Sequence, residues 1–204
     1  MLIVRKLRAD DIQSAEIFIE DVLKETFEAN DIWHMQALLK SEIDSKKALF
    51  RSTLALCTDN EKRIVLLAVD GHQIVGSVSI TNPNDDITSV KEAECQNIHE
   101  VGSLFVAPDR RGCGLGAVLW LAAVMQFQKS GETLLCFDSG YPFAQQTWQK
   151  RFGKPQFELI DRWGEGTRHM IWKLSVENAL SCITEWLSMK KPYSYQSSLS
   201  ELHD

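Results

Sequence analysis

A segment near the middle of the chain joins a strand to a helix through a turn rich in glycine and arginine. Residues 104–116 read Leu-Phe-Val-Ala-Pro-Asp-Arg-Arg-Gly-Cys-Gly-Leu-Gly. Glycines allow the backbone to approach a ligand closely, and the free N–H groups at a helix start favour an anion. Arg110 and Arg111 add positive charge of the kind that pairs with phosphate. The segment therefore predicts a pyrophosphate site at a helix N-terminus.

The spacing of the glycines argues against two common phosphate-binding loops. The pattern Gly-x-x-x-x-Gly-Lys-[Ser/Thr] is absent, which argues against a P-loop NTPase. Gly112, Gly114 and Gly116 lie two residues apart, which is not the G-x-G-x-x-G spacing of a dinucleotide-binding loop. A turn with no ligand is the remaining alternative, and the gathering of glycines and arginines at one helix start argues against it.

Length and charge narrow the possible classes of protein. The chain has 204 residues, which argues for one domain, or one domain with an appendage. Its net charge of −6 argues against a nucleic-acid partner and mildly favours a cationic substrate. No apolar run reaches the length of a membrane span. Charged residues occur too early in the N-terminal segment for a signal peptide. We therefore expect a cytoplasmic protein with no membrane partner.

The cysteines and histidines carry no metal or disulfide pattern. The five cysteines are odd in number, widely spaced and without a C-x-x-C pair, and the five histidines show no paired ligand spacing. We expect no metal site and a reducing compartment.

Hydrophobic periodicity and turn residues predict the order of strands and helices. Strands are predicted at residues 2–7, 63–69, 73–80, 98–106, 134–137, 157–160 and 170–174. Helices are predicted after Asp10–Asp11, after Asn30–Asp31, at about 116–129, at 142–152, and from Val176 to Pro192. Asp70-Gly71 predicts a type I′ hairpin, and residues 82–97 predict a loop. The order predicts a mixed α/β fold with helices on both faces of the sheet.

Residues 106–116 resemble motif A of the GNAT superfamily of N-acetyltransferases, V-x-P-x-x-R-x-x-G-x-G. Its fixed positions are filled by Val106, Pro108, Arg111, Gly114 and Gly116. The element order over about residues 3–175 is also similar to that fold. The resemblance implies a mixed, mostly antiparallel sheet with a splayed strand pair and helices on both faces. It implies a GNAT domain over residues 1–176, then an extra C-terminal helix and a mobile tail over 177–204.

The resemblance implies acetyl-CoA as co-substrate. The CoA pyrophosphate would meet the backbone amides of Arg111, Gly112, Cys113, Gly114, Leu115 and Gly116, with positive charge from Arg110 and Arg111. Backbone groups of Leu104, Phe105 and Val106 would meet the pantetheine arm. A β-bulge would splay this strand from the strand at 134–137, and a backbone N–H there would stabilise the oxyanion. Cys113 is a small spacer in this interpretation rather than a nucleophile.

The implied mechanism is direct attack by an amine, with no covalent enzyme intermediate. An alkyl amine has a pKa of about 10, so it arrives protonated and needs a base. His99 and Glu100 are the candidates, and their side chains point to opposite faces of a strand. We favour Glu100, and the alternative is that either residue is a solvated polar group at a strand end.

The general acid is where the chain departs from the family pattern. Many members carry a Tyr in the pattern A-x-x-x-Y-x-x-x-G, and the aligned position here holds Trp148 or Gln149. Tyr141 and Ser139 are alternative proton donors to the leaving sulfur. The CoA thiolate, with a thiol pKa of about 8.5, can also leave without an acid.

The sequence leaves several alternatives for the acceptor amine and for the oligomeric state. A polyamine, an amino acid, an aminoglycoside-like molecule and a protein amine all fit. A CoA-binding module without turnover and an enzyme for a longer acyl-CoA are the alternatives. The tail helix carries an apolar stripe that includes Leu180, Ile183 and Leu187, and such a stripe must be buried. We predict a homodimer, and we interpret Trp163, Trp172 and Trp186 as core or interface residues.

Overall fold

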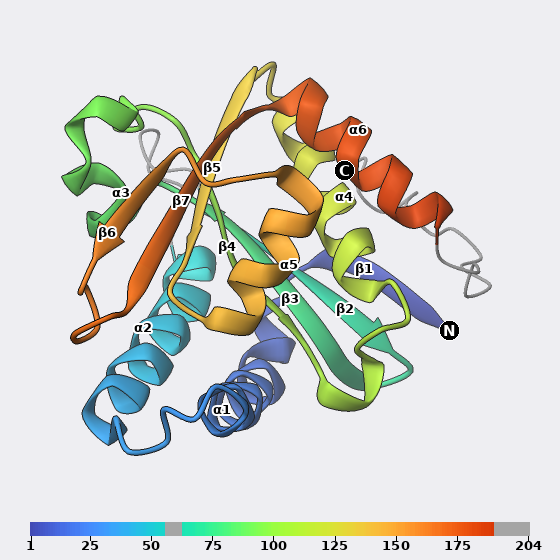
Figure 1. Cartoon of the computed structure of the whole chain (residues 1–204). Coiled ribbons are helices and arrows are strands. Elements are labelled where there is room, and N and C mark those ends of the chain that lie inside the picture. Colours follow the sequence, from blue (N-terminus) through green and yellow to red (C-terminus); the bar gives the residue numbers. More distant parts are fainter. Residues whose placement is uncertain (56–62, 190–204) are drawn as a thin grey trace.

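Within the residues that the structure describes, 1–55 and 63–189, the strands form one seven-stranded sheet in the order β1-β2-β3-β4-β5-β7-β6 (Figure 1). This computed structural model places the strands at β1 (Leu2–Lys6), β2 (Ile64–Asp70), β3 (Gln73–Thr81), β4 (Glu100–Val106), β5 (Leu134–Ser139), β6 (Phe157–Ile160) and β7 (Arg168–Ser175). Neighbouring strands are antiparallel except β4 and β5, which are parallel. The predicted mixed, mostly antiparallel sheet is confirmed.

Helices cover both faces of this sheet. They are α1 (Ile12–Ala29), α2 (Gln36–Ala55), α3 (Asp85–Ser89), α4 (Leu115–Lys129), α5 (Pro142–Phe152) and α6 (Val176–Ser188). Figure 1 shows α1 and α2 together on one side of the sheet, and α4, α5 and α6 on the other. The predicted extra C-terminal helix is confirmed as α6, while Pro192 and the tail predicted to be mobile lie outside the described residues.

The start of the second helix differs from the prediction. Asn30 and Asp31 do not cap α2, because α1 ends at Ala29 and α2 begins only at Gln36. Asn30 instead closes α1, where its side-chain amide donates to the carbonyl of Thr26 at 2.8 Å. Asp31 then takes a left-handed conformation with φ of 57°, which turns the chain away from the helix axis.

The β2–β3 hairpin is present, but its turn is not of type I′. Asp70 pairs with Gln73, so the turn residues are Gly71 and His72. Of these two, only Gly71 has a positive φ, at 63°, whereas a type I′ turn needs positive φ at both. The predicted 82–97 loop also contains α3 and a short 3-10 helix, Lys91–Ala93.

An aromatic cluster joins α4 to the strand that follows it. Phe137 on β5 stacks on Trp172 of β7, with ring centroids 5.0 Å apart. Trp120 on α4 meets Phe137 edge-on at 5.0 Å, and both Trp120 and Trp172 are almost fully buried. The cluster therefore fixes the first helix after the glycine-rich segment against β5, the strand next to β4 in the sheet.

Candidate active site

β4 and β5 diverge soon after they meet. Their register joins Glu100 to Cys136, and the Cys136 N–H donates to the carbonyl of His99 at 3.1 Å. Since the two strands are parallel, both continue from this point in the same direction, and an opening lies between them. The splayed strand pair implied by the family resemblance is confirmed.

A β-bulge in β4 lies at this opening. Gly102 pairs with Ser79 and Phe105 pairs with Ser77, so two residues of β4 oppose Val78 alone. One of the two, Ser103, has a positive φ of 48°, and its carbonyl accepts a hydrogen bond from the Ser77 hydroxyl at 2.9 Å. The bulge takes backbone groups of β4 out of the regular ladder with β3.

The glycine-rich loop, residues 107–116, leads from β4 into α4. Gly112 and Gly114 have φ of 76° and 94°, so side chains there would be strained. The N–H groups of Ala117 and Val118 donate to the carbonyl of Gly114 at 3.0 and 3.2 Å. The hydrogen bonds of the helix begin with those two, and the amides of Leu115 and Gly116 precede them. The loop thus has the glycine conformations and the helix start that the sequence predicts, and its role as an anion site stays a prediction.

Both arginines of the loop are paired with carboxylates. Arg111 donates two hydrogen bonds to Glu25 on α1, at 2.8 and 2.5 Å, and one to the carbonyl of Val106 at 3.1 Å. Arg110 lies 3.0 Å from Asp70. These contacts tie the loop to α1 and to the β2–β3 hairpin, so the arginines position the loop in addition to adding positive charge.

Glu100 is a buried carboxyl group at the point where β4 and β5 separate. It is 8% exposed, and its Oε2 accepts the backbone N–H of Asn84 at 2.8 Å. A Cβ on Gly102 would lie 2.7 Å from Oε1, so the carboxyl group lies over Gly102 in the direction of the bulge. Burial, and next the charge of Asp138, raise the pKa of Glu100 to about 7.

His99 lies just before β4, which begins at Glu100 and not at residue 98 as predicted. Its Nδ1 lies 2.5 Å from Oε2 of Glu132, in the turn before β5. His99 is therefore engaged away from Glu100, and of the two candidates Glu100 is the one whose side chain follows the strand toward the bulge.

Ser139 is the last residue of β5, and Tyr141 lies two residues beyond it, just before α5. The Ser139 hydroxyl accepts the backbone N–H of Tyr141 at 3.2 Å. The Tyr141 ring meets Phe27 of α1 edge-on, with centroids 6.0 Å apart. Burial raises the pKa of Tyr141, with a smaller contribution from Glu42, so its hydroxyl stays protonated at neutral pH. Trp148 belongs to the aromatic cluster with Trp120 and offers no acid.

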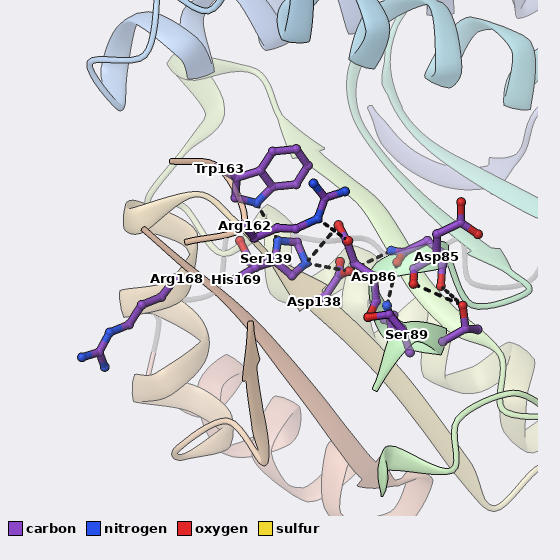
Figure 2. Close-up of polar contacts among 12 residues, drawn as sticks. Asp85, Asp86, Ser89, Asp138, Ser139, Arg162, Trp163, Arg168 and His169 are labelled. Carbon is purple, nitrogen blue, oxygen red and sulfur yellow. Dashed lines mark hydrogen bonds and ion pairs between the residues drawn. The ribbon is translucent and has the colours of Figure 1, made fainter. Parts of the chain in front are cut away.

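A hydrogen-bonded chain beside Glu100 was not predicted from the sequence. Oδ2 of Asp138 on β5 accepts from the side-chain amide of Asn84 at 2.8 Å and contacts Nε2 of His169 on β7 at 2.9 Å. The indole N–H of Trp163 donates to Nδ1 of His169 at 3.0 Å. Figure 2 shows Asp138, His169 and Trp163 joined in line, with Asp86 and Arg162 paired alongside.

Two further properties of the described part of the chain, 1–55 and 63–189, concern metal binding and membrane insertion. No group of three or more His, Cys, Asp or Glu side chains there is arranged to hold a metal ion. None of the helices described combines the length and the apolar character that crossing a bilayer requires.

Comparisons with known proteins agree with this geometry. The model of the acetyltransferase (GNAT) family matches residues 21–154. The acetoin utilization protein AcuA of Bacillus subtilis (strain 168) is 36% identical over 64 residues, a match that spans 31% of this chain and only 30% of AcuA.

Solved structures show the same fold. A GNAT-family protein from Desulfovibrio desulfuricans superposes with a TM-score of 0.64 at 16% identity, over 86% of this chain and 99% of that one. The PaiA N-acetyltransferase of Thermoplasma acidophilum, solved in complex with coenzyme A, has a TM-score of 0.59 at 14% identity, over 85% and 99%. With the family model covering most of the chain, the conclusion is that this protein belongs to the acetyltransferase (GNAT) family.

Proposed function

We propose that the protein transfers an acetyl group from acetyl-CoA to an amine by direct attack within a ternary complex. The observation that carries the proposal is the position of Glu100. Its carboxyl group is buried where β4 and β5 separate and lies along β4 toward the bulge. A base in that position is next to the gap in which a thioester held by the glycine-rich loop would lie.

The donor half of the site follows the loop and the strand before it. The backbone amides of residues 111–116 bind the CoA pyrophosphate, and Arg110 and Arg111 hold the loop in place. Backbone groups of residues 104–106 bind the pantetheine arm. A backbone N–H at the bulge then polarises the thioester carbonyl and stabilises the oxyanion. The positive φ of both Gly112 and Gly114, and the free amides at the start of α4, support this assignment.

The chemistry uses Glu100 as the general base. An alkyl ammonium with a pKa of about 10 must lose a proton before it attacks, and a carboxylate whose pKa is raised to about 7 is better matched to that task than an ordinary one. The first proton passes from the ammonium nitrogen to Glu100, and the N–C bond then forms. The C–S bond breaks with its electron pair on sulfur, and the second nitrogen proton is lost to solvent as the amide forms.

The leaving thiolate, with a thiol pKa of about 8.5, departs without complete proton transfer. Tyr141 is held neutral by burial and supplies a hydrogen bond to sulfur rather than a proton. Ser139 positions Tyr141, because its hydroxyl accepts the Tyr141 backbone N–H.

The acceptor is proposed to be a small cationic amine. The net charge of −6 and the carboxylates of Glu100, Asp138 and Glu42 around the opening support a cation. We further propose a cytoplasmic location, no nucleic-acid partner, a domain over 1–176 with an appended helix, and a homodimer. The apolar stripe of α6 that led to the homodimer prediction packs on α4 and α5 of its own chain, so the dimer needs its own test.

The test is a turnover screen of several acyl-CoAs against a panel of amines, read as release of free CoA thiol. The proposal predicts release with acetyl-CoA and at least one small diamine or polyamine, and loss of release in Glu100→Gln. Binding of acetyl-CoA without release in any combination would instead support a module without turnover. Faster release with succinyl-CoA than with acetyl-CoA would assign a longer acyl donor.

A further inference from the structure

Asp138 is the centre of the polar chain beside Glu100. A single oxygen of this carboxyl group, Oδ2, meets both the side-chain amide of Asn84 at 2.8 Å and Nε2 of His169 at 2.9 Å. Donors that converge on one carboxyl oxygen hold the group in place. Whether the histidine is one of these donors depends on its tautomer.

Trp163 decides the tautomer of His169. An indole N–H can only donate, so Nδ1 of His169, which lies 3.0 Å from it, must be the acceptor. The ring proton then belongs to Nε2 and points to Asp138. This close arrangement needs Gly140, because a Cβ there would lie 2.7 Å from the indole nitrogen and 3.1 Å from Nδ1. His169 is 5% exposed, and Figure 2 shows it between Trp163 and Asp138.

Asn84 connects this chain to Glu100. Its backbone N–H donates to Glu100 at 2.8 Å while its side-chain amide donates to Asp138 at 2.8 Å. Its side-chain oxygen accepts the N–H of Ile87, which caps α3 and fixes the residue. The two carboxyl groups are thus held on either side of one rigid residue, close enough for the charge of Asp138 to disfavour a second charge on Glu100.

Other charged groups also face the pair. Lys46 on α2 favours the ionised form of Glu100, and Asp86 lies 4.0 Å from Nε2 of His169. Asp86 is itself paired with Arg162 at 2.5 Å, so its charge is compensated. Asp138 is therefore the carboxylate that acts on Glu100, with Lys46 opposing it.

We propose that Asp138, held in place by Asn84 and by the Nε2 tautomer that Trp163 imposes on His169, is a positioning residue whose negative charge favours the protonated form of Glu100. Asp138 exchanges no proton in the reaction. It acts through Glu100, which takes the proton from the acceptor ammonium. The inference rests on the proposed role of Glu100 as base, and it assigns a role to residues that the loop motif does not contain.

The first test is the pH dependence of kcat/KM with Asp138→Asn. Removing the negative neighbour should shift the acid limb of the profile downward by about one pH unit or more, while the KM for acetyl-CoA stays unchanged because the loop is elsewhere. Glu132→Gln is the matched control. It removes a carboxylate that contacts His99, and should leave the acid limb in place.

A second measurement does not depend on turnover. The full chain labelled with 13C at glutamate carboxyls allows Glu100 to be titrated directly, with Glu100→Gln to assign its resonance. The inference predicts a midpoint near 7 that falls in Asp138→Asn, even if no amine is ever acetylated, so failure of the proposed function and failure of the inference are distinguishable. An unchanged midpoint in folded Asp138→Asn would overturn it.

The histidine tautomer provides a readout in the unaltered protein. Long-range 1H–15N spectra at pH 7 should show His169 neutral with its proton on Nε2, and Trp163→Phe should free Nδ1 and change that pattern. A doubly protonated His169, or one with its proton on Nδ1, would overturn the inference even if Asp138→Asn failed to fold.

Discussion

Trp186 on α6 lies against Gly116 in the first turn of α4: a Cβ at Gly116 would be 3.8 Å from Cη2 of the tryptophan. The guanidinium of Arg151 on α5 covers the same ring at 4.7 Å from its centroid. The extra helix therefore reaches the glycine-rich loop itself, and the appended part of the chain contributes to the packing behind the proposed pyrophosphate site.

Replacing this tryptophan should weaken the fold. Trp186 is 9% exposed, and Trp186→Ala should lower the free energy of unfolding by about 3–5 kcal/mol, because a large buried side chain leaves a cavity. Denaturant unfolding measures the change. Met189→Ala is the control, since this neighbour is 62% exposed and should cost little. Light scattering on the same samples tests the homodimer, which a monomer at all concentrations would exclude.

A negative charge in the loop should abolish CoA binding. Gly114→Glu brings a carboxylate to the helix start that we assign to the pyrophosphate, so attraction becomes repulsion. Gly131→Glu is a matched control, because Gly131 also has a positive φ, 74° against 94°, but lies at the far end of α4. Calorimetry should show lost CoA affinity in the first variant and retained affinity in the second. Equal affinity in two folded variants would contradict the assignment.

A methyl group on Gly102 should separate catalysis from binding. Its Cβ would lie 2.7 Å from Oε1 of Glu100, so Gly102→Ala must displace the carboxyl group that we assign as base. We expect kcat to fall on the order of 10²-fold with little change in acetyl-CoA affinity. Wild-type kcat in this variant would mean that the position of the Glu100 carboxyl is not critical.

The free energy of unfolding should depend on pH through the same carboxyl group. The pKa of Glu100 is raised from 4.5 to about 7 on folding, so the folded state holds its proton more tightly than the unfolded chain does. The contribution of this group is therefore fully present below pH 4.5 and is lost as pH rises to about 7, at about 1.4 kcal/mol per pKa unit. Glu100→Gln should be more stable than wild type at pH 8 and gain nothing at pH 4. Parallel stability curves for the two proteins would exclude the raised pKa.

Much of the fold follows from local patterns in the sequence. The strand, loop and helix around residues 104–116 need specific glycines and a fixed order. His99, expected within a strand over 98–106, instead lies just before β4. Asn30 was misassigned because a residue of this type closes one helix as readily as it opens another. In this chain the carbonyl of Thr26 lies within its reach.

The surroundings of Glu100 could not be predicted in the same way. Asn84 belongs to the polar stretch that is predicted as a loop, and the sequence predicts Trp163 to be a core or interface residue. Both matter through side-chain contacts made across β5 and β7. Such contacts depend on the strand register and on the position of α3 in the fold. Hydrophobic periodicity specifies neither of these.

The role of Glu100 as the base of an acetyl transfer is tested most directly by kcat/KM for CoA release against pH in wild type and Glu100→Gln. Wild type should show an acid limb with a midpoint near 7. The variant should lose that limb and have a rate lower by about 10²–10⁴-fold. A Glu100→Gln enzyme with the rate and the pH profile of wild type would contradict this role.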